Sequence, residues 1–139
     1  MSGVTANGAA VAAAAEALVG TPFRLHGRDP ATGLDCVGLV AAAFASIGCR
    51  PSVPRGYGLR NAGISPWLDL AAVAGLTEVK DGGRPGDVVL VRPGPGQHHL
   101  LIALDRNRFA HAHAGLRRVV VQPGPLPWCV ERRWRLEED

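Results

Sequence analysis

Three residues of this sequence carry side chains that could act together as a nucleophile and its base: Cys36, His99 and His111. A cysteine attacks as its thiolate, an imidazole accepts and returns the proton, and a further polar group fixes the tautomer of that imidazole. Such a set performs nucleophilic catalysis. The plainer interpretation is that Cys36 is a small buried apolar residue and that both histidines are ordinary strand residues.

Cys36 stands at the start of the clearest helical pattern in the sequence. From this residue, apolar side chains recur at i+3, i+4, i+7, i+8 and i+11: Leu39, Val40, Ala43, Phe44 and Ile47. The spacing predicts a helix over residues 36–47 that Asp35 caps and Gly48 ends. Unpaired N–H groups and the helix dipole lower the pKa of a thiol in a first turn, and we expect Gly38 to leave room beside it.

The candidate bases lie in the second half of the chain, where residues 97–104 contain a predicted strand. Side chains alternate between the two faces of a strand, so His99 shares a face with Leu101 and Ala103, while His98 points to the other face. We therefore expect only one of the two adjacent histidines to face Cys36.

His111 and His113 follow on the next predicted strand, on the same face as Phe109. A turn of odd length near residues 105–107 would bring this face beside His99 and complete the set of nucleophile, base and orienting group. A metal site made of His99, His111 and His113 is a rival interpretation, although no carboxylate or fourth ligand stands at a suitable spacing.

These residues have to be positioned by helices in the first half of the chain and strands in the second. A helix is predicted over residues 9–19 from its alanine content, a shaped loop over residues 21–34, and a short helix over residues 66–74. Five strands are predicted over residues 87–91, 99–104, 108–113, 117–122 and 128–136. Helices before strands indicate an α+β domain in which an antiparallel sheet packs on the Cys36 helix.

Length and composition favour one globular domain over residues 1–139. Apolar residues make up 47% of the chain and charged residues 19%, which is typical of a globular protein and not of a disordered one. The formal net charge is +3, but the one dense basic run is residues 131–135, so we do not expect nucleic-acid binding.

Two further features bear on the compartment in which the protein works. The N-terminal alanine-rich stretch has no basic region before it and is interrupted by Glu16, so we expect neither a signal peptide nor a membrane span. Cys36, Cys49 and Cys129 make an odd count without close spacing. This pattern favours free thiols in a reducing compartment over disulfides or a zinc knuckle.

Four motifs, taken in order, give the sequence a family resemblance. They are residues 20–24 (GTPFR), residues 34–39 (LDCVGL), residues 84–89 (RPGDVV), and the stretch from His99 to His111. In order and spacing they resemble the NlpC-like cell-wall peptidases, particularly the compact versions carried by phage tails and gene transfer agents. Each motif alone is weak, and the four together are specific.

The resemblance implies a papain-like α+β fold and a cysteine peptidase that needs no metal or other cofactor. By this resemblance Cys36 matches the nucleophile, His99 the base that opens a strand, and His111 the third polar residue on the following strand. The backbone N–H of Cys36 is the expected oxyanion donor. Asp35, Phe23 and Tyr57 are expected on the substrate side of the site, with Tyr57 on a loop over residues 50–65 that shapes the cleft.

The substrate class implied by the resemblance is the peptide stem of bacterial peptidoglycan, cut between γ-D-glutamyl and diaminopimelyl residues. The implied partners are peptidoglycan and the hub or baseplate proteins of a phage-like particle. We expect the protein to be made in the cytoplasm and carried in a phage-like tail to the cell wall.

The sequence departs from the family pattern at three positions. Val37 replaces a serine, Leu101 replaces a glycine, and Phe23 replaces a tyrosine, which keeps the ring and removes a hydroxyl donor. Two other functions therefore stay open at this point. One is a structural tail-tip or hub subunit with a decayed site, and the other is a papain-like amidase that acts on a substrate outside the wall.

Overall fold

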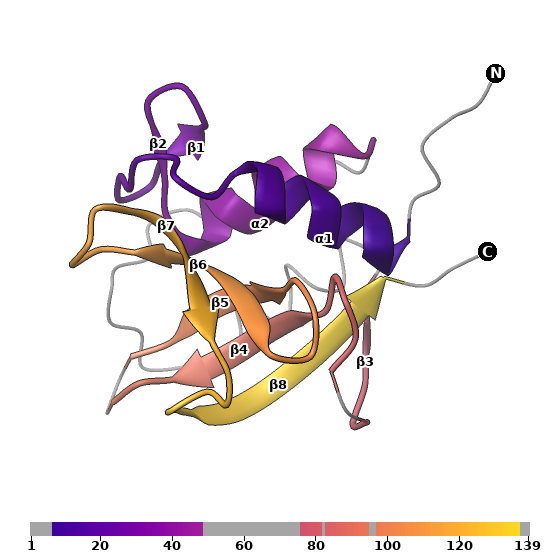
Figure 1. Cartoon of the computed structure of the whole chain (residues 1–139). Helices are drawn as coiled ribbons and strands as arrows, with labels where there is room; N and C mark the ends of the chain where they lie inside the picture. The colour runs from indigo at the N-terminus through magenta and orange to yellow at the C-terminus, as the bar shows by residue number, and fades with distance from the viewer. Residues whose placement is uncertain (1–6, 49–75, 82, 95–96, 137–139) are drawn as a thin grey trace, which may run out of the picture.

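Two helices lie against one face of a six-stranded antiparallel sheet in the computed structural model, which describes residues 7–48, 76–81, 83–94 and 97–136 (Figure 1). The helices are α1 (Gly8–Ala17) and α2 (Cys36–Ser46). The sheet has the order β3-β8-β4-β5-β6-β7. Its strands are β3 (Leu76–Glu78), β4 (Val88–Arg92), β5 (His99–Ala103), β6 (Arg108–His113), β7 (Arg118–Pro123) and β8 (Cys129–Leu136). A separate hairpin of β1 (Arg28–Asp29) and β2 (Gly33–Leu34) precedes α2.

Helix α2 begins and ends as its sequence predicts. The Asp35 backbone is extended, and its side chain accepts a hydrogen bond of 2.8 Å from the N–H of Gly38, which satisfies a donor of the first turn. At the other end Ile47 is the cap, and Gly48 follows with a φ of 90° that suits glycine. The predicted range of 36–47 is confirmed to within one residue.

Helix α1 ends at Ala17, two residues before the end of the predicted helix over residues 9–19. The side chain of Asn7 caps its start by accepting from the N–H of Ala10 at 2.9 Å. The helix gives way to turns at Leu18, and Gly20 then adopts a φ of 96°. The predicted helix over residues 9–19 is therefore confirmed with shifted ends, as is common for helix boundaries.

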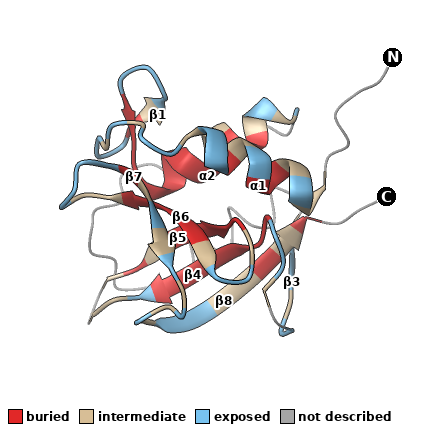
Figure 2. Cartoon of the chain, in the orientation of Figure 1, coloured by how far each residue is buried: buried red, intermediate tan, exposed pale blue. Residues whose placement is uncertain are grey.

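The sheet divides the buried side chains into two clusters. The larger one fills the space between the helices and the sheet, and includes Val40 and Phe44 from α2 with Leu100 and Ile102 from β5. The smaller one lies on the other face of the sheet, where Leu101 is packed with residues of β4 and β6. Buried residues accordingly gather on α2 and the central strands (Figure 2). Strand β5 is covered on both faces, which explains why the four residues after His99 are all apolar.

All five predicted strands are present as β4 to β8, each with ends within two residues of the prediction. The structure adds elements that the sequence did not indicate. The predicted loop over residues 21–34 contains the β1–β2 hairpin, and β3 joins the sheet beside β8. The predicted loop over residues 50–65 with Tyr57, and the predicted helix over residues 66–74, lie outside the described residues.

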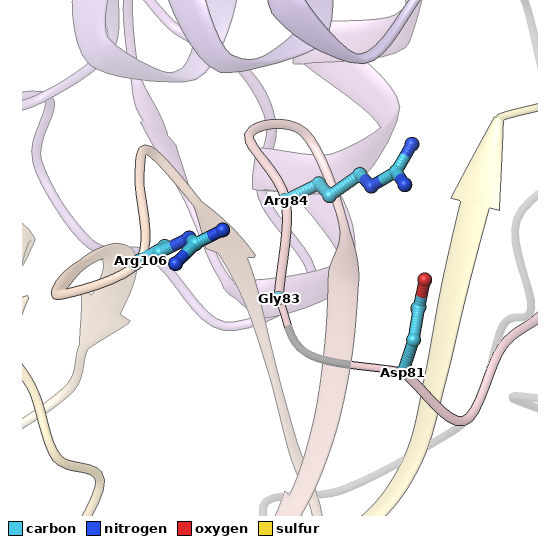
Figure 3. A pocket seen from close by; sticks show the side chains of 4 residues that line it. All are labelled: Asp81, Gly83, Arg84 and Arg106. Carbon is cyan, nitrogen blue, oxygen red and sulfur yellow. The ribbon is translucent and has the colours of Figure 1, made fainter.

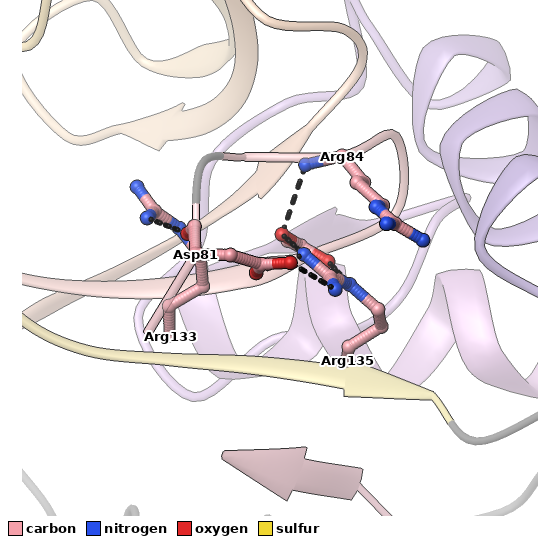
Figure 4. A network of polar contacts seen from close by, with 5 residues as sticks. Asp81, Arg84, Arg133 and Arg135 are labelled. Atoms are coloured by element: carbon pink, nitrogen blue, oxygen red, sulfur yellow. Dashed lines mark hydrogen bonds and ion pairs between the residues drawn. The ribbon is translucent and has the colours of Figure 1, made fainter. Parts of the chain in front are cut away.

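The carboxylate of Asp87 ties the turn before β4 to the strand β8. It is fully buried, accepts from the Arg84 N–H at 3.0 Å, and receives two hydrogen bonds of 2.8 and 2.9 Å from the guanidinium of Arg135. The same guanidinium also pairs with Asp81 at 2.9 Å. Figure 4 shows how these side chains converge between the turn and β8. The motif over residues 84–89 is thus a folding element that anchors β4, the neighbour of β5.

Candidate active site

Cys36 lies at the first position of α2 and its thiol is held against the start of β5. Only 8% of the residue is exposed. The backbone N–H groups of Leu100 and Val37 hydrogen-bond to its sulfur. Leu100 directly follows His99. The N-terminus of α2 and the start of β5, which are far apart in the chain, therefore meet beside the thiol of Cys36, at the peptide between His99 and Leu100.

The thiol of Cys36 is protonated in this environment. Burial raises its pKa to about 12, and the nearby negative charge of Asp35 adds to the rise. The N–H groups of Leu100 and Val37 and the charge of Arg28 lower the pKa by less. This corrects the expectation that its place in a first turn lowers the pKa, because the loss of hydration outweighs the favourable N–H groups.

Asp35 binds the loop before α2 as well as capping the helix. Besides the cap to Gly38, its carboxylate accepts from the N–H of His26 at 2.8 Å and from the guanidinium of Arg28 at 3.1 Å. The side chain is 2% exposed, while that of Arg28 is 29% exposed. These contacts fix the residue that precedes Cys36 and therefore fix where the thiol points.

Gly38 has a different role from the one that its position beside the thiol predicts. A Cβ atom added at this residue would collide with the carbonyl oxygen of Gly27 and approach the side chain of Leu34. The missing side chain therefore makes room for the loop that leads into the β1–β2 hairpin, and not for the thiol. This close approach seats the loop on α2.

Three histidines lie on one face of the sheet, as strand alternation predicts. His99 is on β5, and His111 and His113 are on β6, where Leu101 pairs with His111. The ring centroids of His99 and His111 are 5.8 Å apart in an edge-on arrangement, and those of His111 and His113 are 5.1 Å apart. His98 is buried directly before β5.

His111 is enclosed by two residues that the sequence did not single out for this purpose. The ring of Trp128 meets it edge-on at a centroid distance of 5.4 Å, and the side chain of Gln122 hydrogen-bonds to it. Gln122 pairs with Phe109 across β6 and β7, so it lies on the face that carries His111. Strand alternation could have predicted the place of Gln122. Trp128 lies in the irregular segment between β7 and β8, where alternation does not apply.

The imidazoles of the buried His111 and the half-buried His99 are neutral near pH 7. Burial lowers the pKa of His111 to about 4, with further lowering by the charges of His99 and His113 and a smaller rise from Gln122. Burial also lowers the pKa of His99, with the charges of His113 and His98 adding to it. A neutral imidazole can accept a proton, so His99 is in the protonation state that a base requires.

The other expected site residues stand in different positions. Phe23 is partly buried against the larger cluster and bridges to Leu34, two residues before Cys36. Tyr57 lies outside the described residues. In the part of the chain that the structure describes, no group of three or more His, Cys, Asp or Glu residues is arranged to hold a metal ion, so the geometry gives the rival metal site no support. Nor is any described helix long and apolar enough to span a membrane.

The match to known proteins covers this whole site. Residues 20–124 of the 139 match the NlpC/P60 family. The chain belongs to the NlpC/P60 family. Among curated relatives, it is 27% identical to Protein P54 of Enterococcus faecium over 122 residues, which is 88% of this chain. It spans only 21% of the length of that relative.

Solved structures place the fold in the same family. The NlpC/P60 domain of the peptidoglycan hydrolase SagA is 25% identical, with a TM-score of 0.63 over 94% of this chain and 98% of that one. NlpC1 from Trichomonas vaginalis has a TM-score of 0.69 at 22% identity over 94% of this chain and 46% of that one. The two helices on a six-stranded antiparallel sheet are thus the papain-like NlpC/P60 fold that the sequence predicted.

Proposed function

We propose that this protein is a cysteine endopeptidase that hydrolyses the peptide stems of peptidoglycan, with Cys36 as nucleophile and His99 as base. The observation that carries the proposal is the contact of the Cys36 sulfur with the Leu100 N–H, one peptide from His99. Membership of a family that includes peptidoglycan hydrolases supports the substrate class. His111, with its ring 5.8 Å from that of His99, is proposed to orient the base.

The mechanism starts from a neutral thiol and a neutral imidazole. As the Cys36 sulfur attacks the carbonyl carbon of the scissile amide, its proton moves to His99, and the carbonyl oxygen takes up the negative charge. The backbone N–H of Cys36, in the first turn of α2, is the proposed donor to this oxyanion. Attack and proton transfer are coupled because the high pKa of the free thiol disfavours a thiolate in the resting site.

Collapse of the tetrahedral intermediate then breaks the C–N bond. The proton held by His99 goes to the leaving amine, and the acyl group stays on the Cys36 sulfur as a thioester. His99, neutral again, takes a proton from water as the hydroxide attacks the thioester. The carboxylic acid leaves, and the proton returns to the sulfur. His111 stays neutral in this cycle because its pKa is lowered to about 4, and it is proposed to act by fixing the ring of His99.

The finer assignment of the substrate extends this proposal. The bond cut is the one between γ-D-glutamyl and diaminopimelyl residues, which rests on the family resemblance of residues 20–24 and 34–39. Phe23 is proposed to line the substrate side because it bridges to Leu34, two residues before Cys36. Asp35 is expected there from the sequence, but its buried carboxylate holds the helix start and the preceding loop. Tyr57 is proposed there from the sequence alone.

Delivery by a phage-like tail is also proposed from the resemblance. If the protein is a component of such a particle, mass spectrometry of purified particles from the producing strain will detect it together with hub or baseplate proteins. Its presence in cell extracts with none in the particles would contradict this route and leave the proposed hydrolysis untouched.

The proposed activity is tested by digesting purified peptidoglycan and identifying the released fragments by mass spectrometry. The wild-type protein should release stem fragments with a new amino terminus on diaminopimelate, and Cys36→Ala should release none. Cys129→Ala is the matched control, because Cys129 is an exposed free thiol at the start of β8. Equal release by wild type and Cys36→Ala would refute the role of Cys36.

A further inference from the structure

Three arginines near the candidate active site have no partner in the described part of the chain. Most other described arginines are paired with carboxylates, as Arg28 is with Asp35 and Arg135 is with Asp87. The exposed side chains without an ion pair or side-chain hydrogen bond include those of Arg24, Arg117 and Arg118. Neighbouring guanidinium groups repel each other. An anion bound between these three groups would relieve the repulsion and would be attracted by each of them.

Backbone contacts hold these three residues at the end of the molecule where α2 begins. The N–H of Arg24 donates to the carbonyl of Leu34 at 3.2 Å, and the N–H of Phe23 donates to the carbonyl of Arg117 at 2.9 Å. Pro22 forms a bridge with Arg118. The loop after α1, the β1–β2 hairpin and the turn between β6 and β7 accordingly lie together (Figure 1).

Arg118 also continues the row of histidines. It pairs directly with His113 across β6 and β7, and directly opposed residues point to the same face of a sheet. The ring of His113 is 5.1 Å from that of His111, which is 5.8 Å from that of His99. One face of the sheet thus leads from the proposed base to the guanidinium of Arg118, which has no ion pair with any residue that the structure describes.

We propose that Arg118, flanked by Arg24 and Arg117, binds a carboxylate of the substrate peptide on the face of the sheet that carries His99. The inference rests on the proposed function of Cys36 and His99 and names the recognition element of that site. A guanidinium can hold a carboxylate by two parallel hydrogen bonds, which gives orientation as well as affinity.

The length of the row selects which carboxylate is bound. An extended peptide advances about 3.4 Å per residue, while two of the three steps from His99 to Arg118 are 5.8 and 5.1 Å long. The row is longer than one residue, so we infer that the carboxylate lies beyond the residue whose bond is cut. The free C-terminal carboxylate of a stem tetrapeptide stands two residues beyond that bond, and the long side chain of Arg118 would have to reach back over the rest of the row. The carboxylate on the glutamyl residue stands nearer the bond.

The test compares two synthetic stem tetrapeptides, one with a free C-terminal carboxylate and one with a C-terminal amide. Binding is measured by calorimetry to Cys36→Ala, which does not turn the peptides over, and to Cys36→Ala with Arg118→Gln. Loss of a charge-assisted contact should weaken binding of the acid about tenfold or more and leave binding of the amide unchanged. Equal binding of acid and amide by Cys36→Ala would overturn the inference, as would an equal loss for both peptides.

A matched control separates local contact from overall charge. Arg106→Gln also removes one positive charge from an exposed arginine that pairs with no described carboxylate. Arg106 lines a depression of about 360 Å³ with Asp81, Gly83 and Arg84 (Figure 3). This substitution should leave the preference for the acid intact, and a loss as large as that of Arg118→Gln would overturn the inference. Cleavage of the same peptides by the protein with Cys36 intact reports on the proposed function alone, so the two can fail separately.

Discussion

At the scale of single residues, the site is built as a neutral pair. Burial raises the pKa of Cys36 and lowers that of His99, so each group is driven away from its charged form. A preformed thiolate and imidazolium would have to be stabilised against this loss of hydration. In the proposed mechanism the proton of Cys36 therefore moves during the attack, when the substrate and the oxyanion contact lower the free energy of the charged state.

Alkylation of Cys36 tests the protonation state of the thiol. Because the pKa is raised to about 12, the thiolate fraction should grow about tenfold per pH unit from pH 7 to pH 10. The rate of iodoacetamide labelling, followed by peptide mass spectrometry at Cys36, should rise without a plateau over this range. A plateau beginning near neutral pH would contradict the neutral resting thiol. Labelling of the exposed Cys129 in the same samples gives the internal comparison.

The pH dependence of hydrolysis tests the state of the base. The pKa of His99 is lowered, so its neutral form persists below pH 6.5, and the acidic limb of kcat/KM should have its midpoint below that value. His113→Gln removes one of the charges that lower the pKa, so the midpoint should move upward. Burial is the larger cause of the lowered pKa of His99, so the midpoint of the His113→Gln variant should still lie below 6.5. A midpoint at or above 6.5 in the wild-type protein would argue against His99 as the base.

At the scale of elements, the seating of the loop before α2 depends on the absence of a side chain at Gly38. Gly38→Ala places a Cβ atom against the carbonyl oxygen of Gly27, and overpacking of this kind costs about 1–3 kcal/mol of unfolding free energy. Urea unfolding should show this loss, and kcat/KM should fall because Cys36 is displaced.

Gly83→Ala is the control for the loop experiment, since a Cβ atom there has no neighbour within 4 Å. It should leave the unfolding midpoint and the activity close to those of the wild-type protein. If both substitutions had the same effect, the close approach of Gly38 to Gly27 would not be what seats the loop.

The elements that the sequence predicted are those with a strong periodic signal. Helix α2 repeats apolar residues over three turns. In β5 and β6, counting every second residue places His99 and His111 on one face. The β1–β2 hairpin and β3 have only two or three residues per strand, too few for a period to appear. These short strands form because their backbone groups pair with an adjacent strand, β1 with β2 and β3 with β8.

The direction of the thiol pKa could not be predicted for a similar reason. The helix start is visible in the sequence, and it predicts a lowered pKa. The burial of Cys36 arises from the packing of α2 on β5, which joins residues more than sixty positions apart. In the same way the contacts of Gln122 and Trp128 with His111 exist only once β7 and the segment before β8 are folded around it.

At the scale of the whole molecule, the Asp87–Arg135 pair joins the turn before β4 to its neighbouring strand β8. Asp87 is fully buried, so removing its charge takes away the buried carboxylate that pairs with the guanidinium of Arg135. Breaking a buried pair from one side is strongly destabilising, and Asp87→Ala should lower the free energy of unfolding by about 3 kcal/mol. Urea denaturation measures it.

Asp105→Ala is the matched control, because Asp105 forms its pair with Arg108 at the surface. Exposed ion pairs contribute little to stability, so the urea unfolding midpoint of Asp105→Ala should stay near that of the wild-type protein. Should Asp87→Ala be as stable as this control, the buried pair would not be what anchors β4 beside β8.

The central claim, that Cys36 forms a covalent bond to the acyl part of the substrate, is tested most directly by trapping the acyl-enzyme. The protein is mixed with a stem peptide, and the reaction is quenched in acid within milliseconds to seconds. The mass of the intact protein is then measured by mass spectrometry, before peptide mapping. The account predicts an added mass equal to the acyl fragment, located on the peptide that contains Cys36 and absent from Cys36→Ala. Hydrolysis that proceeds with no adduct at Cys36, or that survives Cys36→Ala, would contradict it.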